Sequence, residues 1–78
     1  MSRIPKRVEV SGTWFDVREG WAGKLELHEY NRNPQYTAKE PFIHTDNHFH
    51  VFDVNGNKVG EFNTSNGSCS GYVNSFEL

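Results

Sequence analysis

The sequence is poor in cysteine and in long apolar runs, and each shortage excludes a class of protein. Its single cysteine, Cys69, cannot close a disulfide within the chain, which excludes a secreted disulfide scaffold. One cysteine also falls short of the Cys₂His₂ and Cys₄ zinc modules. No stretch approaches the roughly 18 consecutive apolar residues of a membrane span, and the first residues lack the apolar core of a signal peptide. We therefore expect a cytoplasmic protein without a membrane partner.

The chain is also short and rather polar. A chain of 78 residues forms one domain and buries only about 60% of its unfolded surface, which leaves little room for an enzyme-sized cleft. Hydrophobic residues make up 35% of the chain, but the aromatic fraction of 14% is too high for a disordered segment. We predict a basic amino-terminal arm at residues 1–7, followed by a single small β domain at residues 8–78.

Charge is unevenly distributed along the chain. Residues 1–7 carry three bases and no acid, so the remaining residues hold five bases against ten acids, a net charge of −5. A protein that binds duplex nucleic acid needs a basic face toward the phosphates. The sequence therefore disfavours direct nucleic-acid binding, and an accessory role of this kind would have to act through the basic arm.

Alternation of apolar and polar residues predicts short strands along most of the chain. The clearest cover residues 8–11, 13–17, 24–30, 48–54, 57–63 and 70–78. Strands this dense predict an all-β protein, either a small antiparallel meander or a partly closed barrel of about five strands.

Residues 17–28 leave an alternative open. Asp16 and Glu19 have the spacing of a helix capping box, whereas Gly20 and Gly23 favour a turn between two strands. We prefer the hairpin, with at most one short helix in this region.

The dipeptide Asn55-Gly56 predicts a hairpin with a two-residue type I′ turn. The register that follows puts Phe49, Val51 and Phe62 on one face. It places these pairs opposite each other: Asp53 and Lys58, Phe52 and Val59, His50 and Glu61, and Phe49 and Phe62. The stretch 31–41 has no period and contains two prolines, so we predict a loop there, either functional or a plain connector.

Three histidines, His44, His48 and His50, lie within seven residues. His48 and His50 are two residues apart on one predicted strand, so they point to the same side. Together with His44, their imidazoles could form a metal site with Glu61 as an outer acceptor. The spacing matches no ligand signature, and we favour the interpretation in which His48 and His50 lie on the solvent side of an edge strand beside Glu61. We therefore expect no cofactor and keep a small metal-binding protein as an alternative.

Catalytic patterns are not evident. Cys69 has no nucleophile elbow or base beside it in the sequence, and the acidic residues include no pair marked out by its neighbours. The run that begins at Asp53 lacks the glycine and the glutamate of a calcium loop at the required positions. We predict that the protein is not an enzyme.

Aromatic residues in turns suggest a contact surface. Trp14 and Tyr30 are expected to close the core, whereas Trp21 lies in a glycine-framed turn and Tyr36 in the proline-bracketed stretch. With acidic neighbours they predict a surface that binds a protein partner with a basic surface. The residues predicted to make this contact are Trp21, Tyr36, Glu19, Glu29 and Glu40.

No family motif is present in these residues. In size, acidity and aromatic content the chain resembles the small stand-alone inhibitors that bacteriophages make against host defence systems. That resemblance implies a non-catalytic protein that masks a basic, nucleic-acid-binding surface of a host protein. A homodimer formed through a sheet edge is also compatible with a sheet this small.

Overall fold

A computed structural model describes residues 4–20, 24–30, 32–40 and 47–78. These residues form eight antiparallel strands and no helix, which confirms the all-β prediction with more strands than expected. The strands are β1 (Arg7–Val10), β2 (Thr13–Glu19), β3 (Leu25–His28), β4 (Pro34–Lys39), β5 (His48–Asp53), β6 (Lys58–Asn63), β7 (Cys69–Gly71) and β8 (Val73–Glu77).

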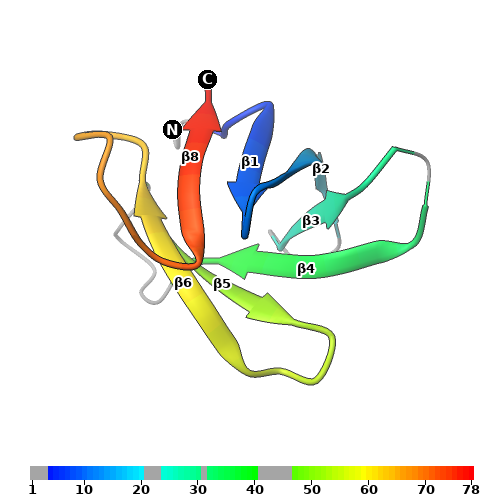
Figure 1. The fold of residues 1–78 in the computed structure, drawn as a ribbon. Coiled ribbons are helices and arrows are strands. Elements are labelled where there is room, and N and C mark those ends of the chain that lie inside the picture. The colour runs from blue at the N-terminus through cyan, green and yellow to red at the C-terminus, as the bar shows by residue number, and fades with distance from the viewer. Residues whose placement is uncertain (1–3, 21–23, 31, 41–46) are drawn as a thin grey trace.

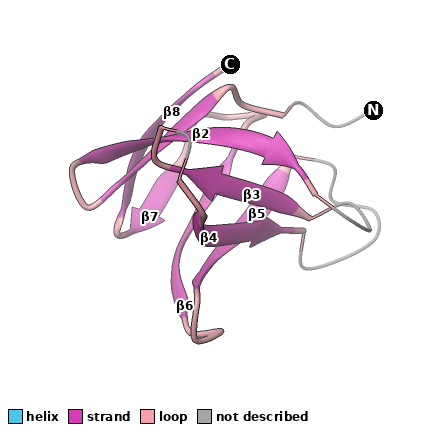
Figure 2. Cartoon of the chain, turned by 90° about the vertical axis from the view of Figure 1, so that its right-hand side faces the viewer, coloured by secondary structure: helices cyan, strands magenta, loops and turns pink. Residues whose placement is uncertain are grey.

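The strands form one sheet that curls almost into a barrel. Their order is β7-β6-β5-β4-β3-β2-β1-β8, so only β8 leaves the simple meander, by pairing with β1. Figure 1 shows β8 beside β1, with β6 on its other side. Figure 2 shows β2, β3 and β4 side by side across the opposite wall.

Tyr72 joins the two ends of the sheet. Its N–H donates to the Val59 carbonyl of β6 at 2.9 Å, and its carbonyl accepts from the Ser11 N–H beside β1, also at 2.9 Å. Gly60 permits this close approach, because a Cβ there would lie 2.6 Å from the Ser70 carbonyl oxygen. These two bonds link β6 to the turn after β1, which brings the ends of the sheet together.

The core is the inner face of this curled sheet. Phe49 and Phe62 stack at its centre with ring centroids 5.1 Å apart, as their predicted pairing requires. The inward residues alternate along the strands, as expected when one face is buried. The buried hydrophobic residues are Val8, Val10, Phe15, Leu25, Leu27, Ala38, Phe49, Val51, Phe62 and Val73.

Residues 17–28 do not form the alternative helix in their described part. β2 continues to Glu19 and β3 begins at Leu25, and these two residues face each other across the sheet. The Gly20 N–H donates to the Lys24 carbonyl at 2.6 Å, which closes a hairpin. Trp21, which follows Gly20 in the sequence, lies outside the described residues.

The prediction of a loop over 31–41 was wrong for most of its length. Pro34–Lys39 forms β4, paired with β3 on one side and β5 on the other. Pro34 stands at the first residue of this strand, a position where a missing N–H is tolerated. Ala38 is fully buried in the core, so the stretch is structural rather than a free loop.

The predicted type I′ turn at Asn55-Gly56 was also wrong. Gly56 has a positive φ of 84°, but Asn55 does not, and the Gly56 N–H donates to the Asp53 carbonyl at 3.0 Å. The Asp53 carboxylate accepts the N–H groups of Asn55 and Asn57 at 2.9 and 3.0 Å. Asp53 therefore caps a longer turn.

The longer turn shifts the register of the hairpin near its tip. Phe52 lies opposite Lys58, because a bulge separates this pair from the regular ladder. The predicted Asp53–Lys58 and Phe52–Val59 pairs are therefore absent, whereas those of His50 with Glu61 and Phe49 with Phe62 are confirmed.

The predicted boundary at residue 8 falls inside β1. Pro5 is buried, and the Lys6 N–H donates to the Glu77 carbonyl at 2.6 Å. The Lys6 carbonyl in turn accepts from Val17 at 3.0 Å. Pro5 and Lys6 of the predicted arm are therefore attached to the sheet, and Arg7 is the first residue of β1.

Candidate functional site

A hollow of about 400 Å³ lies on the outer face of β1 and β2, next to the turn after β3. On β1 and β2, Val8 and Phe15 face the core, so their neighbours Arg7, Trp14 and Asp16 face outward. Two aromatic rings and two carboxylates line the hollow, together with one guanidinium. Its chemistry-bearing residues are Arg7, Trp14, Asp16, Glu29 and Tyr30.

The turn between β3 and β4 brings Glu29 and Tyr30 to this hollow. His28 is buried beneath the turn, with its Nδ1 2.8 Å from the Arg32 carbonyl and its Nε2 3.0 Å from a Glu26 carboxylate oxygen. The Arg32 N–H donates to the Glu29 carbonyl at 3.2 Å. These bonds hold the turn over the outer face of β2 and β3, where Asp16 pairs with His28.

Tyr30 is the most unusual residue of the hollow. The prediction that it closes the core was wrong, because 77% of its surface is exposed. Its backbone has a φ of 57°, a left-handed conformation that costs roughly 1–2 kcal/mol for a residue with a Cβ. Backbone strain of this kind often lies at functional sites, which makes Tyr30 a candidate contact residue.

Arg7 is held at the rim of the hollow. Its guanidinium lies 4.8 Å from the Trp14 ring centroid, and its Nε donates to a Glu77 carboxylate oxygen at 2.6 Å. Glu77 thus neutralises Arg7. In the described part of the chain no ion pair involves the Asp16 or Glu29 carboxylate, so the hollow has an excess of negative charge.

A second cluster lies on the adjacent strands β5 and β6. Glu61 is directly opposite His50, and its Oε1 lies 2.7 Å from His48 Nε2 and 3.6 Å from His50 Nε2. Lys58 Nζ donates to the other carboxylate oxygen at 2.5 Å. β5 lies between β4 and β6, so the prediction that His48 and His50 lie on an edge strand was wrong. His44 lies outside the described residues.

The electrostatics of this cluster favour an ionised Glu61. Hydrogen bonds from Lys58 and His48 lower the pKa of Glu61 from 4.5 to about 2. Burial lowers the pKa of His50 below its usual 6.5, and the nearby Lys58 charge acts in the same direction. An anionic carboxylate therefore faces two imidazoles, one of which resists protonation.

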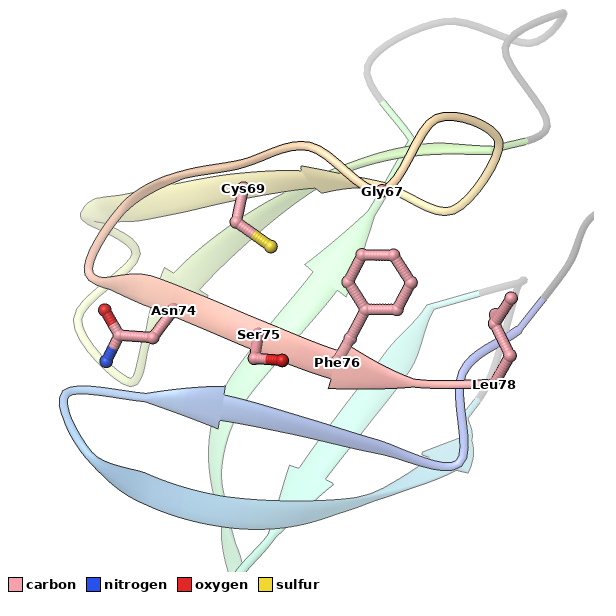
Figure 3. Close-up of a pocket in the computed structure, with 6 residues that line it drawn as sticks. All are labelled: Gly67, Cys69, Asn74, Ser75, Phe76 and Leu78. Carbon is pink, nitrogen blue, oxygen red and sulfur yellow. The ribbon is translucent and has the colours of Figure 1, made fainter.

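Cys69 lines a second hollow, of about 370 Å³, between β7 and β8. Figure 3 shows its sulfur and the Phe76 ring directed into this space from the two strands. Burial raises the pKa of the Cys69 thiol, which keeps it protonated at neutral pH. Because a thiol nucleophile must ionise, this environment disfavours nucleophilic chemistry at Cys69.

The predicted contact residues lie at different ends of the sheet. Glu29 lines the hollow, whereas Glu19 ends β2 and Glu40 follows β4 at the opposite end of these strands. Tyr36 is half-buried on β4, with its ring packed edge-on against Phe15 at 5.1 Å between centroids. Strict alternation along β2 was the sequence signal that could have placed Trp14 and Asp16 outside the core.

Comparison of this chain with family models, curated proteins and solved structures finds no match. Within the described residues, no helix has the length and apolar character needed to cross a membrane.

Proposed function

We propose that the chain is a non-catalytic binding module that recognises the basic surface of a protein partner. The observation that carries the proposal is the hollow that combines Trp14 and Tyr30 with the carboxylates of Asp16 and Glu29. The Trp14 ring already carries the Arg7 guanidinium, so the ring that attracts a further cation is the exposed Tyr30, and an unpaired carboxylate neutralises the charge of that cation. A lysine or arginine side chain of the partner fits this combination.

The charge of the whole chain supports the same partner. Residues 8–78 carry a net charge of −5, which attracts a basic surface over a distance and speeds association. Arg7 does not oppose this attraction at the rim, because Glu77 neutralises it.

A small inhibitor that masks a nucleic-acid-binding surface is one form of this function. Such a surface is rich in lysine and arginine, so the same hollow would bind it. A wider contact through Trp21, Tyr36, Glu19 and Glu40 stays a prediction, as does a homodimer formed through a sheet edge.

The test uses a short peptide rich in lysine and arginine, with a control peptide in which glutamine replaces each base. Binding is measured by calorimetry at low salt. The replacement Tyr30→Asn removes the ring but keeps a residue that tolerates left-handed backbone, so the fold is preserved. We expect this variant to bind the basic peptide between a few-fold and about 30-fold more weakly, the range of a cation–π contact.

Asp16→Asn should weaken binding as well, whereas Glu61→Gln, with the same charge change on β6, should not. The melting temperature of each variant monitors the fold. Equal affinity of the wild type and the Tyr30→Asn and Asp16→Asn variants for the basic peptide would exclude the hollow as its site.

A further inference from the structure

Two histidines and a glutamate converge on β5 and β6, in a part of the molecule that the proposed function does not use. His48 and His50 are two residues apart on β5 and face the same side, and Glu61 lies on the paired strand β6. The backbone ladder of two central strands fixes these positions. The three side chains are therefore brought together by the sheet itself, before any ligand binds.

The ligand atoms of the three side chains lie close to one another. One atom from each residue, the two imidazole nitrogens and a carboxylate oxygen, lie within 4.8 Å of one another. Around a tetrahedral Zn²⁺ with bonds of about 2.0–2.1 Å, neighbouring ligand atoms are roughly 3.3 Å apart. The separations of 2.7 and 3.6 Å between Glu61 Oε1 and the two nitrogens lie on either side of this value.

Lys58 orients the carboxylate of Glu61 for this role. Its ammonium group holds Oε2, which leaves Oε1 directed toward the imidazoles. A carboxylate held in this way acts as a single-oxygen ligand. The Lys58 charge also opposes a cation nearby, so it lowers the affinity of the site while it fixes the geometry.

We propose that His48, His50 and Glu61 form a binding site for a divalent transition metal of the zinc class. Two imidazoles and a carboxylate are a donor set that suits Zn²⁺. To bind the metal, His48 Nε2 must carry no proton, so the proton of its hydrogen bond to Glu61 is released to solvent and the metal takes its place between nitrogen and oxygen. The three side chains are only partly buried, so a water molecule can occupy the fourth position.

The first experiment titrates Zn²⁺ into chelator-treated full-length protein and measures its affinity by competition with a zinc indicator. We expect one equivalent to bind. Loss of an outer partner alone usually weakens metal binding by roughly 10- to 100-fold, so His48→Asn and Glu61→Gln, which remove direct ligands, should each weaken it at least as much. Asp16→Asn is the matched control and should leave affinity unchanged.

A second measurement needs no variant and so does not depend on how the variants fold. Nitrogen NMR of the wild-type imidazoles should show that Zn²⁺ shifts the Nε2 resonances of His48 and His50. Those of His28, buried beneath its own turn, should not move. No binding of Zn²⁺, or binding that leaves the His48 and His50 resonances in place, would overturn the proposal.

Discussion

Glu61 shows how one side chain can control a local network. It contacts Lys58 through one carboxylate oxygen and His48 through the other, and lies opposite His50. Each of these contacts favours the ionised carboxylate, which explains its pKa of about 2. The stability of the β5–β6 pair should therefore depend on pH through this residue.

The direction of the pH dependence follows from the difference in pKa between the folded and the unfolded protein. Glu61 has a pKa of about 2 when folded, against 4.5 ordinarily, so its stabilising effect is complete above about pH 4.5 and is lost as pH falls toward 2. The lowered pKa of His50 causes a further loss of folding stability as pH falls below about 6.5, because the unfolded state binds a proton at His50 more readily than the folded state does.

We expect denaturation of the metal-free protein to become easier as pH falls from 7 to 2. The difference in unfolding free energy between the wild type and Glu61→Gln should shrink between pH 5 and 2. Urea unfolding at several pH values measures this difference. A constant difference over that range would contradict the role assigned to Glu61.

Among the elements, the turn between β5 and β6 can be explained either as a type I′ turn or as a longer turn capped by Asp53. A type I′ turn would need left-handed backbone at both Asn55 and Gly56, whereas only Gly56 adopts it. The Asp53 carboxylate caps the turn instead, with two backbone N–H groups as donors.

This turn yields a paired prediction. Asn55→Ala should change the unfolding free energy by no more than about 0.5 kcal/mol, because its backbone needs no special residue. Gly56→Ala should cost about 1–2 kcal/mol, because alanine disfavours a positive φ even where space is open. Thermal or urea denaturation of the two variants checks this. Equal and large losses of unfolding free energy in both variants would instead indicate a type I′ turn.

Elements with clear alternation were the predictable part of the fold. The pairing of Phe49 with Phe62 could be predicted, because both residues are apolar and each lies the same number of residues from the turn at Asn55-Gly56. β4 was not predictable in this way, because its burial depends on neighbours on both sides rather than on its own pattern. Pairing of β4 with both neighbouring strands outweighed the unfavourable effect of Pro34 at its start.

At the scale of the molecule, the candidate sites depend on contacts that the sequence separates widely. His48, His50 and Glu61 were within reach of sequence reasoning, since one hairpin brings them together. The hollow was not, because it needs the turn after β3 folded over β2 and Glu77 from the last strand beside Arg7. The closure of β8 on β1 places that glutamate, and no local pattern encodes it.

The acidic, aromatic hollow on the outer face is proposed to receive a basic side chain of the partner. Its most direct test is a two-dimensional NMR titration of labelled wild-type protein with the basic peptide, following the indole N–H of Trp14 and the amides of Glu29 and Tyr30. We expect these signals to shift together and saturate, the shift to weaken with added salt, and β5 and β6 to stay unchanged. Shifts confined to other strands, or none at these three residues, would contradict the account.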